Sequence, residues 1–423
     1  MANVIRELKR RGFIEAATHD ELEKFVEKPR KVYCGFDPTS DSLHLGNLVA
    51  IMSLAWFQKF GHTPVAVIGG ATGLIGDPSG KSHERPLLDE EAIKENLRGI
   101  TKNLQSILQF GTSLPEPVIV DNYDWFSQFN ILTFLRDIGK EFRMGTMLAR
   151  ESVKNRLESE EGMSFTEFTY QLLQAYDFYH LFNDRQVSIQ LGGSDQWGNI
   201  TAGIDLVRRL AGKTVYGAVF PLLTRSDGKK FGKSEKGAIW LSADKLSPFE
   251  FYQHLYRTSD ADVINLMKML TFMDIDEIEK YEALMKEPGY IANTAQIRLA
   301  QEVTRCIHGD KGLAIAQKVT AAAAPGADTE LDREALEGIS SDMPNYTAEA
   351  KFVIDRPLVD VVVDLNIRPS KGDIRRLIRN GGVYLNNSRV ENEQKIIGSD
   401  DLIDGQLMLL SIGKKNKMLI RVN

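Results

Sequence analysis

The stretch KVYCGFDPTSDSLHLGNLVAIMSLAWFQKFGHTPVAVIGGATG, residues 31–73, decides the fold. It begins with a short β-prone run at 31–36, passes through a Pro/Ser/Asp turn and enters an apolar helix from Leu43 to Phe60. The run Val65–Ile68 that follows is wholly apolar, which is typical of a parallel strand covered on both faces. Strand, helix, strand is the right-handed crossover unit of α/β proteins.

A second unit of the same kind follows later in the chain. Residues 186–212, QVSIQLGGSDQWGNITAGIDLVRRLAG, read as an apolar strand, a Gly-Gly-Ser-Asp turn and a helix. We therefore predict an α/β fold, with a doubly wound parallel-sheet (Rossmann-like) catalytic domain over residues 1–246 and a helical insertion at about 123–182. Ligands of such sheets bind at the carboxyl ends of the strands.

The rest of the chain has a different character. Residues 247–324 are helical in composition and periodicity, and 325–350 contain the proline, glycine and acidic residues of a linker. A compact α+β pattern fills 351–423. This last segment holds 13 Lys+Arg and 9 Asp+Glu, whereas residues 1–350 hold 39 and 49. A basic tail on an acidic body leaves room for a polyanion at one end of the chain.

Composition bounds the protein class. Hydrophobic residues make up 43% and charged residues 26%, as in folded globular proteins. Two cysteines, Cys34 and Cys306, provide neither a disulfide framework nor a zinc-site spacing, which favours a reducing compartment and a cytoplasmic location. The most apolar stretch, at 65–76, is too short to cross a bilayer, so we expect no membrane association.

GDPSGKS at 76–82 looks like a phosphate-binding P-loop but is not one. A P-loop needs four residues between its first glycine and Gly-Lys-Ser, and here only Asp77, Pro78 and Ser79 separate Gly76 from Gly80. The stretch needs another explanation.

Four polar motifs are candidates for chemistry. HLGN places His44 and Asn47 three residues apart at the start of a helix, where free N–H groups attract phosphate. KKFGKS at 229–234 is a basic loop suited to a polyphosphate that gains charge. The alternatives are a helix with incidental polar residues near its cap and an ordinary solvated loop.

The other two motifs belong to the second half of the sheet domain. In TYQLLQAYDF, Tyr170, Gln174 and Asp177 share one helix face and can surround a small polar ligand, or they are a core tyrosine with two solvated neighbours. In GGSDQWGN, Asp195 is placed to accept ribose hydroxyls, or it belongs to a plain turn before a helix.

Taken together and in this order, the motifs resemble those of a known enzyme family. HLGN and KFGKS are similar to the HIGH and KMSKS signatures of class I aminoacyl-tRNA synthetases. With VYCGFDPTSDSLHLGN, GGATGLIGDPSGK, TYQLLQAYDF and LGGSDQWGN all present, the chain resembles the bacterial-type tyrosyl-tRNA synthetases over essentially its full length. Two departures are Asn47 for the last histidine of HIGH, and Phe231 and Gly232 in the middle of KMSKS.

The resemblance implies roles for named residues. GDPSGKS would be a loop that lines the amino-acid site, not a P-loop. The tyrosine site would consist of Tyr33, Asp77, Tyr170, Gln174, Asp177 and Gln196. The ATP site would include Cys34, Gly35, Asp37, Gly46, Gly192 and Asp195, with Lys81 and Arg85 as cations near the pyrophosphate. Catalytic groups would be Thr39, His44, Asn47, Lys230, Lys233 and Ser234.

It also implies a reaction and partners. The tyrosine carboxylate attacks the α-phosphate of ATP, accompanied by Mg²⁺, and tyrosyl-adenylate then passes tyrosine to the 3′-terminal adenosine of tRNA(Tyr). Positioning and charge stabilisation suffice for both steps, so no protein nucleophile, prosthetic group or protein metal cage is expected. The family further implies a homodimer.

The tail, RPSKGDIRRLIRNGGVYLNNSRV, resembles an S4-type RNA-binding domain. Ser370 can cap a helix carrying Arg375, Arg376 and Arg379, which would present guanidinium groups to an RNA backbone. A solvated basic helix is the alternative.

Two rival functions remain at this point. One is another enzyme with a similar turn, a tryptophanyl-tRNA synthetase or a small-molecule adenylyltransferase, against which Tyr33, Asp177 and the tail count. The other is a non-catalytic RNA-binding protein on a synthetase scaffold, against which Lys230 and Lys233 count. Tyrosine-dependent ATP–pyrophosphate exchange separates these possibilities.

Overall fold

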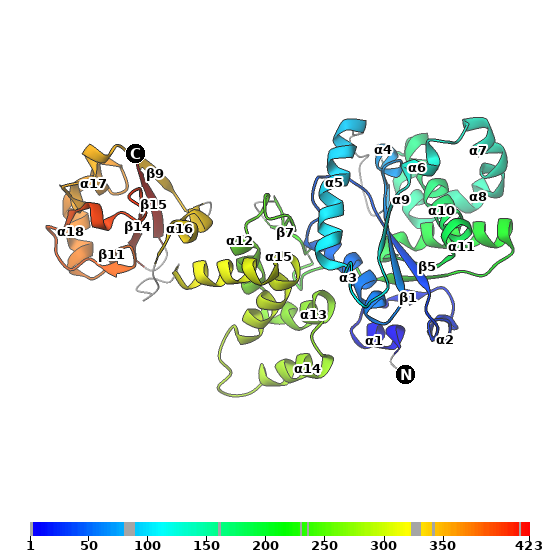
Figure 1. Cartoon of the computed structure of the whole chain (residues 1–423), viewed down its shortest axis with the longest axis horizontal. Coiled ribbons are helices and arrows are strands. Elements are labelled where there is room, and N and C mark those ends of the chain that lie inside the picture. Colours follow the sequence, from blue (N-terminus) through cyan, green and yellow to red (C-terminus); the bar gives the residue numbers. More distant parts are fainter. Residues whose placement is uncertain are drawn as a thin grey trace. The chain divides into compact units, whose positions relative to one another are not determined.

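The computed structural model of the chain describes residues 3–79, 89–159, 162–228, 231–234, 237–322, 331–340, 343–413 and 416–423. The chain divides into two compact units (Figure 1). Unit 1 comprises residues 1–246 and 258–307, and unit 2 comprises 247–257 and 308–423.

Unit 1 is built on a six-stranded sheet in the order β1-β6-β5-β2-β3-β4. β1 pairs antiparallel with β6, and every other neighbouring pair is parallel. The predicted α/β class with a parallel, Rossmann-like sheet is therefore confirmed. The strands are β1 (Ala16–Ala17), β2 (Lys31–Phe36), β3 (Thr63–Ile68), β4 (Val118–Asp121), β5 (Val187–Gly193) and β6 (Tyr216–Phe220).

The strand order reverses between β2 and β5. From β2 the chain proceeds to β3 and β4 on one side, and from β5 to β6 on the other. In doubly wound sheets the crossover helices of the two halves leave opposite sides of such a junction, and ligands bind at the carboxyl ends of its strands, here β2 and β5. This topological switch point is where the sheet offers a ligand site.

Helices cover the sheet of unit 1. In α3, eleven of the fifteen residues are buried, as expected for the central crossover helix. On the sheet, Tyr33 and Val65 pack with Phe178 of α10 in one apolar cluster. The helices and 3₁₀ turns are α1 (Val4–Arg10), α2 (Leu22–Phe25), α3 (Leu45–Lys59), α4 (Thr72–Ile75), α5 (Glu90–Ile107), α6 (Tyr123–Phe126), α7 (Ile131–Asp137), η1 (Gly139–Glu141), α8 (Met144–Leu148), α9 (Glu151–Leu157), α10 (Phe165–Arg185), η2 (Ser194–Gln196), α11 (Trp197–Ala211), α13 (Asp260–Leu270) and α14 (Ile275–Leu284).

Unit 2 contains a second sheet, in the order β12-β11-β14-β15-β9. Its apolar core includes Val359, Ile374, Met408 and Ile420, all at most 2% exposed. The elements are α12 (Pro248–Tyr256), α15 (Thr294–Ala322, which begins in unit 1), α16 (Arg333–Ser340), β9 (Asn345–Ala348), η3 (Ala350–Phe352), β10 (Arg356–Pro357), α17 (Leu358–Asp364), α18 (Lys371–Arg379), β11 (Val383–Leu385), β12 (Ser388–Arg389), β13 (Ile396–Ile397), η4 (Ser399–Asp401), β14 (Leu407–Ile412) and β15 (Asn416–Val422).

The segment predicted as a linker, 325–350, contains regular structure. Within its described residues, α16 contributes the fully buried Leu336, and β9 pairs parallel with β15 at the sheet edge. Arg421 of β15 makes a bidentate ion pair with Glu337 of α16 at 2.6 and 2.7 Å. Acidic residues that favoured a linker in the sequence thus serve partly as ion-pair partners of the sheet.

No helix among the described residues is long and apolar enough to cross a membrane.

Candidate active site

Several of the predicted site residues lie at the switch point. Tyr33 and Cys34 lie in β2, and Asp37 follows its carboxyl end. Gly192 is the second-to-last residue of β5, and Asp195 and Gln196 belong to η2 immediately after that strand. The carboxyl ends of two neighbouring parallel strands therefore supply both halves of the site, as the sheet topology requires.

A buried carboxylate faces a buried phenol at one end of the site. Asp177 of α10 accepts hydrogen bonds from Trp125 Nε1 at 2.9 Å and from Asn122 Nδ2 at 3.2 Å. Burial raises the pKa of Asp177 to about 8, and these two donors oppose the rise. The Tyr33 hydroxyl is also buried and has no hydrogen-bond partner among the described residues. Burial and then the charge of Asp177 raise the pKa of Tyr33 well above its ordinary value.

A buried polar atom without a partner costs about 1–3 kcal/mol. The Tyr33 hydroxyl and the carboxylate of Asp177 lie close enough to interact electrostatically without bonding each other. A ligand hydroxyl that donates to the carboxylate and contacts the phenol would supply the missing bond.

A second cluster surrounds Asp77. Its Oδ2 accepts from Gln196 Nε2 at 2.8 Å, and its Oδ1 accepts from the Ser79 amide at 2.9 Å. Asn199 Nδ2 donates to Gln174 Oε1 at 3.0 Å and to Gln196 Oε1 at 3.2 Å. We call Asp77, Gln174, Gln196 and Asn199 the amide network. It offers a carboxylate and amide oxygens, which are acceptors suited to an ammonium group.

A chain of hydrogen bonds extends from the Asp177 pair to Tyr170. Tyr170 donates to Asp37 Oδ2 at 2.9 Å, and Thr72 donates to Asp37 Oδ1 at 2.9 Å. Asn122 Nδ2 donates in turn to Thr72 Oγ1 at 3.0 Å. Burial, followed by the charges of Asp37 and Asp77, raises the pKa of Tyr170, so its phenol stays protonated and acts as a donor.

The two signature motifs lie together at the start of α3. His44 caps this helix through Nδ1, which accepts from the Gly46 amide at 3.1 Å, and Asn47 Oδ1 accepts from the His44 amide at 3.1 Å. The Leu45 amide donates to Ile239 O at 2.8 Å, and the Ile239 amide donates to Gly232 O at 2.9 Å. HLGN and KFGKS are thus joined through the strand segment that follows KFGKS.

The remaining predicted residues are placed as follows. Gly35 and Thr39 are exposed, Gly46 is partly exposed, and burial raises the pKa of the Cys34 thiol to about 12. For Lys233 and Ser234 the structure describes the backbone, which forms β7 (Lys233–Ser234) opposite β8 (Gly237–Ala238). Lys81, Arg85 and Lys230 lie outside the described residues. In the described parts of the chain, no group of three His, Cys, Asp or Glu side chains is arranged to hold a metal ion.

Sequence reasoning missed three polar residues of the site. Asn122 and Trp125 bond Asp177, and Asn199 connects Gln174 with Gln196. A signal for the first two existed, because VIVDNYDW is an apolar strand followed directly by polar residues, as at the ends of β2 and β5.

The predicted RNA-binding helix is α18 in unit 2. Ser370 caps it, with Oγ accepting from the Asp373 amide at 3.2 Å. Arg375, Arg376 and Arg379 are all exposed, while Ile374 and Ile378 of the same helix are buried in the core. The arginines therefore face away from that core.

Comparison with known proteins gives two family matches. Residues 25–323 match the family described as tRNA synthetases class I (W and Y), which does not separate tryptophan from tyrosine. Residues 335–420 match the tyrosine–tRNA ligase SYY-like C-terminal domain. A tyrosine–tRNA ligase of Protochlamydia amoebophila is 59% identical over 100% of this chain and 99% of its own. The chain belongs to the tyrosyl-tRNA synthetase family.

Other tyrosyl-tRNA synthetases agree with this assignment. One from Roseiflexus castenholzii is 43% identical, with 100% of each chain covered. A crystal structure of a C-terminally truncated mitochondrial tyrosyl-tRNA synthetase from Aspergillus nidulans matches with a TM-score of 0.67 and 33% identity, over 75% of this chain and 92% of that one. As a class I tyrosyl-tRNA synthetase the chain is a tyrosine–tRNA ligase, an ATP-dependent enzyme that acts on tyrosine and tRNA. The tryptophanyl and non-catalytic alternatives are not favoured.

Proposed function

We propose that the buried pair Tyr33 and Asp177 binds the phenol hydroxyl of the substrate tyrosine. The observation that carries this assignment is the unpartnered Tyr33 hydroxyl beside a carboxylate held by Trp125 and Asn122. Phenylalanine would leave both groups unpaired, so the pocket rejects it without editing. Tyrosyl-tRNA synthetase is a standard example of this kind of rejection.

The amide network and Tyr170 then bind the other end of the amino acid. Asp77, Gln174 and Tyr170 surround the ammonium, and Gln196 lies near the carboxylate that attacks the α-phosphate. Support comes from the bonds that bring Asp77, Gln196 and Gln174 into one connected group.

For ATP, we assign the start of α3 and the KFGKS loop to the phosphates. Thr39, His44, Asn47, Lys230, Lys233 and Ser234 would neutralise charge on the transferring phosphate and the departing pyrophosphate. Lys81 and Arg85 would contribute from the substrate loop. Cys34, Gly35, Asp37, Gly46, Gly192 and Asp195 would hold the nucleoside. Mg²⁺ would enter with ATP as part of the substrate.

In unit 2, we assign Arg375, Arg376 and Arg379 to the backbone of tRNA(Tyr), because they are exposed and lie on one short helix.

The proposed location is the cytoplasm, where ATP and tRNA are available. The domain boundaries at 246, 324 and 350 remain predictions.

Amino-acid-dependent ATP–pyrophosphate exchange tests the assignment. Exchange with tyrosine, and much less with phenylalanine or tryptophan, is the expected result. Exchange with none of the three would contradict the enzyme assignment and leave an RNA-binding protein.

Removing the Tyr33 hydroxyl should weaken discrimination more than activity. We expect Tyr33→Phe to lower the ratio of kcat/KM for tyrosine over phenylalanine by roughly ten-fold, the value of one neutral hydrogen bond. Exchange measured with both amino acids gives the ratio. Tyr216→Phe is the matched control. Tyr216 is the first residue of β6, at the amino ends of the parallel strands, whereas the site lies at their carboxyl ends. Equal ratios in the two variants would remove Tyr33 from the pocket.

We also propose a homodimer, formed through the helical insertion. Seven large apolar side chains exposed in the described residues fall between 131 and 165: Ile131, Leu132, Leu135, Met144, Leu148, Leu157 and Phe165. Such a concentration is typical of an interaction surface.

Phe165→Asp should therefore convert the dimer to a monomer at micromolar concentration. Phe165 is 76% exposed at the first position of α10, where an aspartate suits the helix dipole and leaves folding intact. Sedimentation or light scattering gives the mass. Ile291→Asp, at a residue 78% exposed outside the insertion, should leave the dimer unchanged. A Phe165→Asp variant that stays dimeric would place the interface elsewhere.

A further inference from the structure

Arg150 connects the insertion to the helix that follows β5. It precedes α9, and its Nη1 donates a hydrogen bond to the carbonyl of Gly198 in the first turn of α11. Burial lowers the pKa of Arg150 and nearby Asp205 opposes this, but a guanidinium stays charged at neutral pH. A charged donor makes this bond roughly twice as strong as a neutral one.

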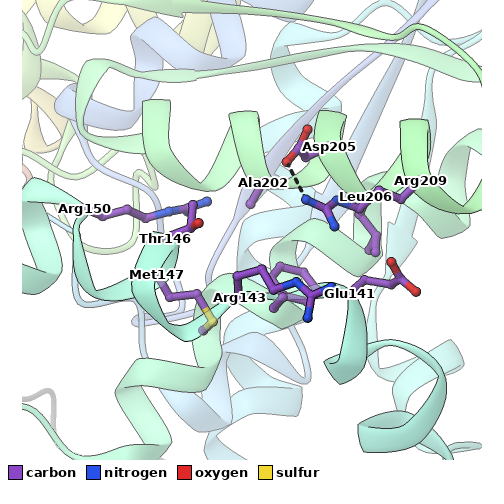
Figure 2. Close-up of a pocket in the computed structure, with 10 residues that line it drawn as sticks. Glu141, Arg143, Thr146, Met147, Arg150, Ala202, Asp205, Leu206 and Arg209 are labelled. Carbon is purple, nitrogen blue, oxygen red and sulfur yellow. Dashed lines mark ion pairs between the residues drawn. The ribbon is translucent and has the colours of Figure 1, made fainter.

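Arg150 reaches α11 along a pocket between the insertion and this helix. Figure 2 shows Arg143 and Arg150 from the insertion and Arg209 from α11 around the pocket. Arg209 pairs with Asp205 at 3.6 Å, and Arg143 is exposed. The three arginines share one pocket, and Arg150 contacts the first turn of α11.

That first turn carries two members of the amide network. Gln196, at the N-cap position of α11, makes no capping bond with its side chain. Gln196 instead bonds Asp77, and Asn199 in the same turn bonds Gln174. The turn therefore positions two members of the amide network, and Arg150 bonds the same turn from the insertion.

We infer that Arg150 is a positioning residue, which fixes the first turn of α11 so that Gln196 and Asn199 hold Asp77 and Gln174 in place for the tyrosine ammonium. This inference rests on the proposed role of the amide network. It gives the part of the insertion before α10 a role in supporting the tyrosine site, to which that part otherwise contributes Trp125.

The test is ATP–pyrophosphate exchange in the absence of tRNA. Arg150→Ala should raise the KM for tyrosine by roughly five- to twenty-fold and leave the KM for ATP nearly unchanged, because small displacements of substrate-binding groups are costly. Arg150→Lys should recover most of the loss, since an ammonium can donate to the same carbonyl. Arg143→Ala, at the exposed arginine of the same pocket, should resemble the wild type.

Three results would overturn the inference. An Arg150→Ala variant with unchanged exchange but slower charging of tRNA would show that Arg150 contacts tRNA. A lower Tm with an unchanged KM for tyrosine would show a purely structural role. A Lys variant no better than Ala would exclude the hydrogen bond as the cause. Wild-type protein without tyrosine-dependent exchange would instead contradict the proposed function, and the inference would fail with it.

Discussion

Asp177→Asn should reduce kcat/KM for tyrosine in ATP–pyrophosphate exchange by roughly 100- to 1,000-fold, while the weak use of phenylalanine changes little. The carboxylate accepts from Trp125 on one oxygen and from Asn122 on the other. An asparagine must turn its NH₂ group toward one of these donors, so the variant loses both a bond inside the protein and a carboxyl oxygen that can accept from the substrate hydroxyl.

As a control, the Asp177→Asn variant should still fold, but its Tm should depend on pH differently from that of the wild type. Burial raises the pKa of Asp177 to about 8, whereas an unfolded aspartate titrates near pH 3.9. Between these values the folded state holds a proton that the unfolded state has lost, so this group makes the protein less stable as pH rises. Asp177→Asn removes the titration. The Tm of the variant should therefore fall less than that of the wild type between about pH 4 and pH 8.

Two findings would contradict this account. Parallel Tm profiles would mean that Asp177 is ionised in the free protein over the whole range. An equal loss of activity with tyrosine and phenylalanine would mean that the carboxylate does not contact the substrate hydroxyl.

The sequence predicted the parts of the fold that depend on local pattern. Val65–Ile68 is wholly apolar because both faces of a parallel sheet are covered, and residues 187–191, which precede a Gly-Gly turn, are a strand of the same sheet. The position of Asp195 after a strand followed from the strand-end rule, whereas the roles of Tyr33, Asp37 and Gly192 came from the family resemblance.

Local sequence pattern could not predict which side chains pair with one another within the site. Asn122 and Trp125 lie more than fifty residues before Asp177, and nothing in their spacing indicates that they bond it. The order of β4 beside β3 brings them there, and strand order is a property of the whole sheet. The structure in 325–350 was missed for a similar reason, because β9 is held by pairing with β15, about seventy residues later.

Gly232→Ala is the second change from which we expect a large effect. Gly232 has φ of 94°, and a Cβ built on it would lie 2.6 Å from the Gly46 amide nitrogen and 3.2 Å from the Gly46 Cα. Neither neighbour can move without displacing the first turn of α3, because the Gly46 amide is bonded to His44 Nδ1. The methyl group should therefore push KFGKS away from HLGN.

The loss should fall on the chemical step, because the two motifs must act on the same phosphates. We expect Gly232→Ala to slow single-turnover formation of tyrosyl-adenylate by roughly 100-fold. Backbone strain at the positive φ accounts for about 1–2 kcal/mol of the added barrier. Gly228→Ala separates strain from contact: Gly228 lies in the same loop with φ of 81°, and a Cβ there would meet nothing within 4 Å. Tyrosine binding should be unaffected in both variants, since Tyr33, Asp177 and the amide network lie outside this contact. If Gly228→Ala slowed the reaction as much as Gly232→Ala, conformational strain alone would explain both, and the close packing of the two motifs would have no special part in catalysis.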